Sequence, residues 1–389
     1  MKYSILVCGA GIVGLSTALA LARRGQRVAV LAPRNDVPAA RPDVYHPRVY
    51  AISPASQRLL DELGVWQAVP PGRIATVQAM EIRGDGDGLV ELDAWQAARE
   101  NLAWIVEAGE IERVLIQAVR MFGIEWIDDR CAGWHDGQVQ TAAGLRLEAD
   151  LFVGADGAAS PLREAAGLKH EFRSYDDIGL VAHFDAELPH QGKAFQWFRE
   201  DGVLALLPLP DTADGPQVSM VWSMRTPRAQ ALLAMPASEQ AAEVERLLAE
   251  AAQGRLGKLK LRSAVHGFPL TLEQSQMVAP GIALAGDAAH RLHPLAGQGL
   301  NLGLGDVETL ARVIAERESF RSPGDWRVLR RYERARAEPV LAMRLATDGL
   351  HRLFGAHAAP LAWLRNVGMR WVDALPFVKR QLIEGASRN

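Results

Sequence analysis

The sequence predicts an α/β protein in which a parallel sheet covered by helices is joined to a second, mostly antiparallel sheet and to helices at the C-terminal end. The chain opens with a strand–helix–strand pattern that contains closely spaced glycines, and a glycine-rich strand–loop–helix segment lies at about 282–310. Between about 179 and 268, apolar and polar residues alternate as they do in antiparallel strands. With 389 residues, of which 49% are hydrophobic, the chain is long enough to form two or three domains.

The first predicted unit spans residues 5–31. An apolar strand at 5–8 leads into a loop with the spacing G-x-G-x-x-G, a helix follows, and a second apolar strand lies at 28–31. In a dinucleotide-binding unit of this kind, the first glycine makes a tight turn, the second admits the pyrophosphate, and the third lets helix and strand pack closely. The loop residues that we assign to nucleotide contact are Gly9, Gly11, Ile12, Val13 and Gly14. The apolar start of the chain also has features of a signal peptide, but the glycine spacing and the strand that follows favour an internal element.

The residue that ends the second strand departs from the usual pattern. An acidic side chain normally stands there and binds the ribose hydroxyls of the nucleotide. This chain has Ala32 instead, and Arg34 and Asp36 are the nearby side chains that could substitute for it. The departure puts the strength of nucleotide binding in question, and not its place.

Short strands and helices are predicted from there to about residue 150. The stretch Gly84-Asp85-Gly86-Asp87-Gly88 is expected to be a hairpin turn, because a Ca²⁺ loop needs a more distant glutamate ligand. The predicted elements are strands within 48–53, 74–98, 104–107 and 124–127, a helix that ends at Gly64, and a helix at 111–121.

An apolar strand at 151–153 ends in Gly154-Ala155-Asp156-Gly157. A carboxylate at the end of a buried strand can face a ligand at the edge of the sheet. The alternative is structural, with Asp156 as the N-cap of the helix that starts near Pro161.

The residues between about 179 and 268 are expected to form a separate sheet with one helix at about 238–252. Alternating strands of this kind can cover an apolar pocket, which suits a substrate domain. No internal repeat or low-complexity linker is apparent.

The segment that organises the chain is 282–310. An apolar strand ends just before Asp287, a glycine-rich loop follows, and an apolar helical pattern begins near Leu300. Such a loop directs backbone N–H groups and the positive end of a helix dipole to one point, which suits an anion or an electron-rich carbonyl. Gly297 and Gly299 allow close approach of a ligand to the backbone, and Pro294 stiffens the loop.

The sequence of this segment, GDAAH…HPLAGQGLNLG, resembles the second flavin motif of the aromatic-ring hydroxylases, and its HPLAGQGLN part is similar to that of the hydroxylases of ubiquinone biosynthesis. The strand that ends in Gly-Ala-Asp-Gly resembles another signature of this family, and the resemblance extends over essentially the whole chain. It implies a discontinuous Rossmann-like FAD domain with a parallel sheet, a substrate domain and C-terminal helices. The residues assigned to the cofactor on this combined basis are Gly9, Gly11, Ile12, Val13, Gly14, Arg34, Arg48, Asp156, Asp287, Pro294, Gly297, Gly299, Leu300 and Asn301.

The resemblance also implies an activity. Enzymes of this family are FAD-dependent NAD(P)H:O2 monooxygenases, and they hydroxylate an aromatic ring through a C4a-hydroperoxyflavin. The expected substrate is a polyprenylated phenol of ubiquinone biosynthesis, with NADPH or NADH as cosubstrate; another aromatic substrate is an alternative. No side chain is assigned as catalytic, since the cofactor carries the chemistry, and the flavin-facing loop with Pro294 and Gly297 is the nearest candidate. A second alternative is an accessory subunit that binds FAD weakly, because Ala32 and Gly109 both depart from the family pattern.

The expected domain division follows the same resemblance. The FAD domain comprises 1–73, 99–178 and 269–325, the substrate domain comprises 74–98 and 179–268, and a helical segment comprises 326–389. The basic, amphipathic stretch at about 361–380 is expected to pack on the protein or on a second subunit, with contact to an anionic membrane surface as the alternative.

Composition bounds the partners and the compartment. A net charge of −3 argues against nucleic acid as the main partner, and two cysteines provide neither a disulfide framework nor a metal cluster. His290 and His293 lie in the predicted loop, so we do not expect them to bind a metal. We expect a cytoplasmic protein, either free or peripheral at the inner membrane, in a homo-oligomer or a biosynthetic complex.

Overall fold

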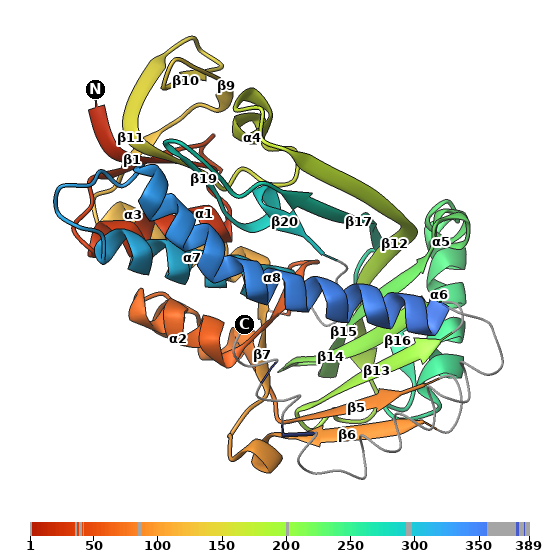
Figure 1. Cartoon of the computed structure of the whole chain (residues 1–389). Coiled ribbons are helices and arrows are strands. Elements are labelled where there is room, and N and C mark those ends of the chain that lie inside the picture. Colours follow the sequence, from red (N-terminus) through yellow and green to blue (C-terminus); the bar gives the residue numbers. More distant parts are fainter. Residues whose placement is uncertain are drawn as a thin grey trace.

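The computed structural model describes residues 2–35, 37–38, 41, 43–84, 88–199, 202–292, 298–355, 379–380 and 385. Within them lie one sheet with a parallel centre, one larger and mainly antiparallel sheet, and one small sheet (Figure 1). The predicted fold class is therefore confirmed. In the described part of the chain, no helix combines the length and the apolar character that crossing a membrane requires.

The first sheet carries the N-terminal unit at its centre. Its strands β1, β2, β8, β11 and β19 pair in parallel. They read as continuous apolar runs because the sheet is buried on both faces; all four residues of β2 are buried, for example. In spatial order the strands are β18 (Val278–Ala279), β19 (Ile282–Leu284), β11 (Arg146–Gly154), β1 (Lys2–Cys8), β2 (Val28–Leu31) and β8 (Glu125–Ile127), with β9 (Cys131–His135) and β10 (Gln138–Thr141) beside β11.

Three helices lie beside this sheet, and the first of them packs against the other two (Figure 1). They are α1 (Ile12–Arg23), α3 (Ala108–Met121) and α7 (Gln298–Ala315). Contact between α1 and α7 is close because Gly303 of α7 leaves no room for a side chain: a Cβ added there would lie 2.8 Å from the Val13 side chain. The first and the last glycine-rich segments of the sequence therefore meet in space. The neighbouring short helices are α2 (Pro54–Glu62) and α4 (Pro161–Ala165), with 3₁₀ turns at Trp66–Ala68 and Pro71–Arg73.

The second sheet is built from long neighbouring strands. It pairs antiparallel throughout except between β13 and β5, which run in parallel. Its order is β20 (His290–Arg291), β17 (His266–Ser275), β12 (His170–Ala186), β15 (Gly215–Arg225), β14 (Gly202–Thr212), β13 (Lys193–Arg199), β5 (Ala79–Arg83) and β6 (Leu89–Asp93), with β16 (Leu259–Leu261) beside β12. The helices α5 (Thr226–Leu233) and α6 (Ala237–Ala252) complete a separate apolar core with it.

Two strands connect the regions of the molecule directly. β12 and β17 continue through the junctions that we expected near residues 178 and 268, so the larger sheet extends toward the flavin motif. The small sheet consists of β3 (Val49–Ile52), β7 (Ala103–Glu107) and β4 (Ile74–Val77). The 3₁₀ turn Ala94–Ala97 follows β6.

The long helix α8 (Trp326–Gly355) extends from the parallel sheet along the larger sheet (Figure 1). Near its start, the hydroxyl of Tyr332 donates a hydrogen bond to the carbonyl of Leu284, which ties the helix to the strand before the flavin motif. Further along, Arg173 of β12 pairs with Asp348. The amphipathic stretch expected at about 361–380 lies outside the described residues, apart from positions 379 and 380.

Candidate functional site

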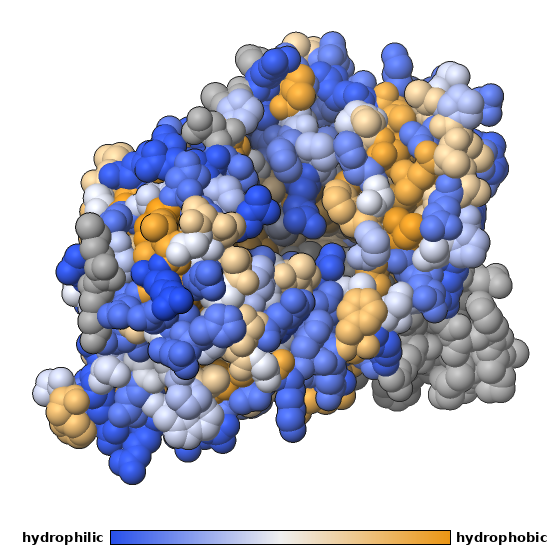
Figure 2. Space-filling view, turned by 90° about the horizontal axis from the view of Figure 1, so that it is seen from above, coloured by the Kyte–Doolittle hydropathy of each residue, from blue (hydrophilic) through white to orange (hydrophobic). Residues whose placement is uncertain are grey.

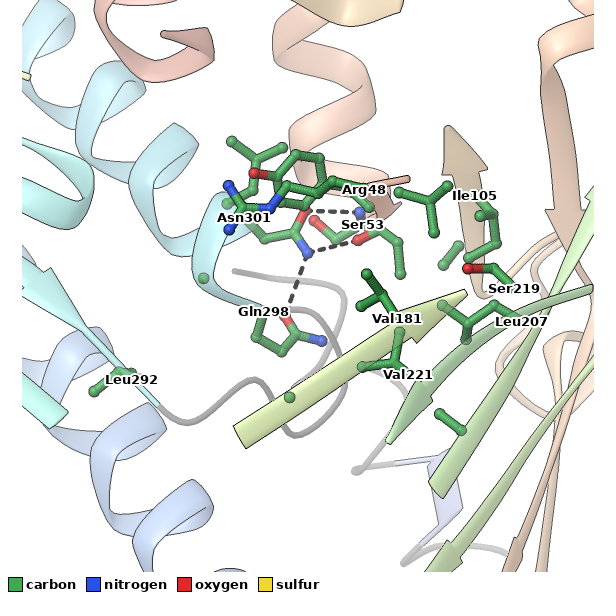
Figure 3. Close-up of a pocket in the computed structure, with 18 of the residues that line it drawn as sticks. Arg48, Ser53, Ile105, Val181, Leu207, Ser219, Val221, Leu292, Gln298 and Asn301 are labelled. Carbon is green, nitrogen blue, oxygen red and sulfur yellow. Dashed lines mark hydrogen bonds between the residues drawn. The ribbon is translucent and has the colours of Figure 1, made fainter. Parts of the chain in front are cut away.

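A cavity of about 490 Å³ lies between the glycine-rich segments and the larger sheet. Viewed from above, the surface of the molecule is mostly hydrophilic and is hollowed near its centre (Figure 2). Figure 3 shows Arg48, Ser53 and Asn301 on one side of the cavity, and Leu207, Ser219 and Val221 on the other. The cavity therefore has one wall made by sequence motifs and another made by the sheet. The predicted site residues that line it are Gly11, Ile12, Val13, Arg48, Asp287, Gly299, Leu300 and Asn301.

The glycines of the first motif divide into two kinds. A Cβ added to Gly11 would meet no atom within 4 Å, and Gly11 borders the cavity at the start of α1. A Cβ added to Gly14 would instead lie 2.2 Å from the carbonyl oxygen of Gly9. Gly9 itself has φ 113°, and a Cβ added to it would lie 2.2 Å from the carbonyl oxygen of Ala155. Gly9 and Gly14 therefore allow β1, β11 and α1 to pack, whereas Gly11 leaves space for a ligand.

The start of α1 suits a phosphate group. Its N-cap, Gly11, has no side chain to bond the first backbone N–H groups, and the first turn contains no acidic residue. The open N–H groups and the helix dipole favour an anion at this point. Gly299, in the first turn of α7, likewise has no atom within 4 Å of an added Cβ and borders the same cavity. These two open positions, one at each helix start, fit a long ligand such as a dinucleotide.

Asp287 stands in the 3₁₀ turn Gly286–Ala288, directly after the strand β19. Its side chain is exposed and borders the cavity, where it can accept hydrogen bonds from a ligand. Asp306 of α7 binds Gly286, which precedes Asp287, and His290, which follows it. The Asp306 carboxylate accepts hydrogen bonds from the backbone N–H of Gly286 at 2.9 Å and from Nε2 of His290 at 2.7 Å.

The position of His290 corrects the sequence interpretation. We expected it in the flavin loop, but it lies in strand β20, is 3% exposed, and faces Asp306 in the interior. Arg336 of α8 contacts the other oxygen of Asp306 at 2.7 Å. Burial by itself raises the pKa of Asp306, but the charges of His290 and Arg336 outweigh it and hold that pKa below its usual value. We did not predict this network from the sequence. The signal that could have indicated it is Asp306 itself, a charged residue within the apolar helical pattern of α7.

The side chain of Asn301 makes hydrogen bonds that its place in the motif did not show. Its side-chain oxygen accepts from the N–H of Ser53 at 2.9 Å, and its amide nitrogen donates to the carbonyl of Ala51 at 2.8 Å (Figure 3). Both ends of the amide are thus used to join α7 to the end of β3. Asn301 therefore shapes the cavity wall.

Arg48 lies just before β3 and borders the cavity. Its guanidinium carbon stands 5.9 Å from the ring centre of Tyr50 and 5.3 Å from that of Phe268. These contacts place a fixed positive charge between the two motif segments and β17. Burial raises the pKa of the Tyr50 hydroxyl, so this side chain is neutral beside Arg48.

The departure at Ala32 has a structural explanation. Ala32 is buried, and its carbonyl accepts a hydrogen bond from the indole of Trp126 at 2.8 Å. Asp128 follows the parallel neighbour strand β8, and its carboxylate accepts from the N–H of Arg34 at 2.9 Å. An acidic side chain is therefore present at this edge, but it comes from β8. Sequence reasoning missed Asp128, although parallel strands end at the same edge of a sheet. Arg34 is exposed and does not border the cavity, and Asp36 lies outside the described residues.

The structure also shows what lies beside Gly109, the second position that departs from the family pattern. A Cβ added there would lie 3.2 Å from the ring of His46, so this imidazole fills the space beside the start of α3. The carboxylate of Glu107 holds the segment with His46, because it accepts hydrogen bonds from the backbone N–H of His46 at 2.5 Å and from Arg73 at 2.9 Å. Glu112, one turn further along α3, borders the cavity, and burial raises its pKa.

Of the predicted site residues that the structure describes, Gly9, Gly14, Arg34 and Asp156 do not border the cavity. The neighbours of Asp156, Ala155 and Gly157, do border it, and one oxygen of Asp156 accepts a hydrogen bond from the N–H of Leu162 at 3.4 Å. The N-cap of α4 is Ser160, so the alternative role for Asp156 as the cap itself does not apply. Pro294 and Gly297 lie outside the described residues.

The sheet side of the cavity is mainly apolar. Small and branched side chains from β12, β14 and β15 form it, among them Val181, Ala205 and Val221. The polar side chains on this wall are few, and Gln196 and Ser219 are two of them, both more than nine-tenths buried. Such a chamber suits an apolar molecule with few hydrogen-bonding groups.

The residues that the structure describes include no group of three or more His, Cys, Asp or Glu side chains that could hold a metal ion. Cys8 and Cys131 are both buried and unpaired.

Comparison with known proteins agrees with this site. The family model of the FAD-binding domain matches residues 2–344. Over 98% of its length, the chain is 33% identical to the ubiquinone hydroxylase UbiL of Rhodospirillum rubrum, of which 89% is covered. It is also 33% identical to the 3-demethoxyubiquinol 3-hydroxylase of Escherichia coli, with 98% of this chain and 97% of that protein covered.

The fold is shared with solved structures of lower sequence similarity. PqsL of Pseudomonas aeruginosa, a probable FAD-dependent monooxygenase, superposes with a TM-score of 0.76 over 95% of this chain and 100% of PqsL, at 23% identity. The p-nitrophenol 4-monooxygenase PnpA of Pseudomonas putida superposes with a TM-score of 0.75 at 18% identity, with 99% of this chain and 98% of PnpA covered. At these identities the likeness shows the fold alone.

Proposed function

Because this chain belongs to the FAD-dependent aromatic hydroxylases of ubiquinone biosynthesis, we propose that it hydroxylates the ring of a polyprenylated phenol with NAD(P)H and O2. The observation that carries this proposal is the composition of the cavity. One wall consists of the two open glycine positions and Asp287, and the other is an apolar sheet surface. A redox cofactor and an apolar ring can therefore lie face to face in one enclosed space.

The residues on the motif side fit FAD. Gly11, Ile12 and Val13 would hold the diphosphate at the start of α1, where the backbone N–H groups have no side-chain cap. Asp287 would accept hydrogen bonds from the ribityl hydroxyls, and the backbone at Gly299 and Leu300 would face the electron-rich edge of the flavin ring. For Arg34, Arg48, Asp156, Pro294 and Gly297 a contact with the cofactor remains a proposal from family resemblance.

When bound, FAD supplies the electron transfer and the activation of O2 that the hydroxylation requires. The residues of the chain bind and orient the two partners and keep water out. The start of α7 stabilises negative charge on the flavin ring through its dipole and its free N–H groups. The apolar wall at Val181 and Val221 excludes water from the space beside the ring, which protects a reactive oxygen species from loss.

The division of labour between the sheets follows from this arrangement. We propose that the parallel sheet with 1–73, 99–178 and 269–325 holds FAD, and that the larger sheet with 74–98 and 179–268 holds the substrate. The polyprenyl chain is best placed along the apolar sheet wall, since an isoprenoid offers no hydrogen bonds and gains from leaving water.

The decisive experiment starts from the purified protein. We expect a yellow preparation whose released cofactor is FAD, and we expect it to add one oxygen atom to a polyprenylphenol when NADH or NADPH and air are supplied. The product is identified by mass spectrometry, and omission of the nicotinamide nucleotide is the control. A protein that stays colourless with excess FAD would instead support the accessory-subunit alternative.

A further inference from the structure

Two buried polar atoms on the sheet side of the cavity lack a hydrogen-bond partner. They are Oγ of Ser219 on β15 and Nδ1 of His183 on β12. Ser219 is 0% and His183 is 1% exposed, so solvent does not reach either of them. A buried hydroxyl or imidazole nitrogen without a partner loses the hydrogen bonds that it made to water, which is costly. A partner from outside the chain would remove this cost.

The two residues are neighbours in the sheet. Ser219 lies directly opposite His183 in the antiparallel pairing of β12 with β15, so their side chains stand on the same face. Ser219 also borders the cavity, beside its other neighbour Leu207 of β14 (Figure 3). His183 stands one row further from the cavity, since Val181 and not His183 borders it.

The hydrogen-bond direction at His183 is fixed by its other nitrogen. Nε2 lies 2.9 Å from the carbonyl oxygen of His46, and a carbonyl can only accept, so Nε2 carries the hydrogen. Burial lowers the pKa of His183, which keeps the imidazole neutral. In this tautomer Nδ1 has a free lone pair and is an acceptor. The two atoms are not bonded to each other in this structure, so Ser219 must change its rotamer before it can donate its hydrogen to Nδ1 and offer its own lone pairs to the cavity.

A second serine on the same strand provides a direct comparison. Ser223 is also buried, but its Oγ accepts a hydrogen bond from the backbone N–H of Val203 at 3.1 Å. It does not border the cavity. Of these two serines, Ser223 therefore has a hydrogen-bond partner within the sheet, whereas Ser219 at the cavity wall has none.

We propose that Ser219, positioned by His183, is the binding site for a hydroxyl group on the ring of an otherwise apolar substrate. The hydroxyl donates to Ser219 Oγ, Ser219 donates to Nδ1 of His183, and His183 donates to the carbonyl of His46. All hydrogens in this chain point one way, so the site accepts a hydroxyl and rejects an ether oxygen, which has no hydrogen to donate. The ring reaches Ser219 after a change of rotamer at Leu207. The inference rests on the proposed function, since it names the part of the substrate that this wall recognises.

The test compares two ligands of nearly equal shape on the FAD-loaded protein, 4-pentylphenol and its methyl ether 4-pentylanisole. Isothermal titration calorimetry gives the dissociation constant of each. For each protein, the dissociation constant of the ether is divided by that of the phenol. We expect this ratio to be about five- to tenfold larger for the wild type than for Ser219→Ala. Ser223→Ala is the matched control, because it removes the same hydroxyl from the same strand outside the cavity, and it should keep the wild-type ratio.

A second variant tests the role of His183. His183→Phe keeps an aromatic ring beside Tyr45 but removes the acceptor. The hydrogen of Ser219 is then free to be donated to a ligand, so the ether should gain affinity relative to the phenol. Circular dichroism establishes that this variant is folded; if it is not, the Ser219→Ala and Ser223→Ala ratios decide.

The inference is overturned if Ser219→Ala keeps the wild-type preference, or if neither ligand binds the wild type at its solubility limit. Failure of the proposed function has a different signature. A protein that prefers the phenol through Ser219 but never oxygenates a polyprenylphenol would refute the reaction and leave the binding site intact. If the wild type oxygenates a polyprenylphenol but Ser219→Ala keeps the wild-type ligand ratio, the reaction is supported and the binding site at Ser219 is refuted.

Discussion

The carboxylate of Asp306 accepts a hydrogen bond from the backbone N–H of Gly286 at 2.9 Å, although the two residues belong to different elements. Asp306 is fully buried in α7, and Gly286 precedes the exposed Asp287. With Arg336 of α8 on the other oxygen, the C-terminal helix contributes to the position of the cofactor-facing turn.

Asp306→Asn should therefore lower the free energy of unfolding by about 3 kcal/mol, because it leaves the buried guanidinium of Arg336 without a countercharge. Urea denaturation of the FAD-saturated protein measures this loss. Glu308→Gln is the matched control, since Glu308 lies on the same helix and is exposed. Equal stability of the two variants would show that the buried network contributes nothing net.

The same residue predicts a pH dependence. The pKa of Asp306 is lower in the folded protein than in the unfolded chain, so its carboxylate stabilises the fold above the unfolded value of about 3.9. That contribution is lost as the pH falls through the folded pKa. The difference in unfolding free energy between wild type and Asp306→Asn should be constant above about pH 5 and shrink in stronger acid. A difference that grows below that pH would contradict the sign of the pKa shift.

Gly11→Ala and Gly14→Ala should separate cofactor binding from packing. An added methyl at Gly11 meets no protein atom, so the apoprotein should lose no more than about 1 kcal/mol in unfolding free energy. The methyl should collide with bound FAD, so the dissociation constant of FAD should rise by about tenfold or more. At Gly14 the methyl would lie 2.2 Å from the Gly9 carbonyl, and we expect about 2–3 kcal/mol of lost stability. Thermal unfolding of the apoprotein and a fluorescence titration with FAD measure the two effects. Tight FAD binding by Gly11→Ala would place the diphosphate elsewhere.

Asp287→Ala should weaken FAD binding by about 1–3 kcal/mol, the cost of leaving buried hydroxyls of the cofactor without an acceptor. The side chain is exposed in the protein alone, so the stability of the apoprotein should not change. Asp287→Asn retains one acceptor oxygen and should fall between wild type and Asp287→Ala. An unchanged dissociation constant in both variants would remove Asp287 from the site.

Asn301→Ala should cost about 1–3 kcal/mol in unfolding free energy, because it removes the hydrogen bonds to the N–H of Ser53 and to the carbonyl of Ala51. Asn101→Ala provides the control, since the buried side-chain oxygen of Asn101 has no hydrogen-bond partner to lose. Chemical denaturation of both variants measures the contrast. If both lose the same stability, the link between α7 and β3 is not what Asn301 contributes.

The motif residues show what could be predicted from the sequence. The spacing of Gly9, Gly11 and Gly14 specified a strand, a tight turn and a helix, and the structure has β1 and α1 at these positions. The position of Asp287 after an apolar strand was equally clear. The sequence did not show that Gly11 is open and Gly14 closed, because the spacing of glycines says nothing about which neighbour approaches each one.

Asn301 and His290 show where such prediction ended. Both lie in or beside the flavin motif; we assigned Asn301 to the cofactor and expected His290 in the loop. The sequence did not show that their side chains bond Ser53, Ala51 and Asp306. A motif fixes the path of the backbone, whereas the direction of each polar side chain depends on which partner the packed elements bring within reach.

The sequence by itself determined the two glycine-rich turns, the alternation of the larger sheet and the family, because each is encoded in residues close together along the chain. Only the tertiary structure decided that the carboxylate of Asp128 bonds the N–H of Arg34 at the edge beside Ala32, and that Ser219 stands opposite His183. The Asn301–Ser53 contact joins residues 248 positions apart. Such contacts depend on strand register and helix packing, which are properties of the assembled core and not of any local stretch.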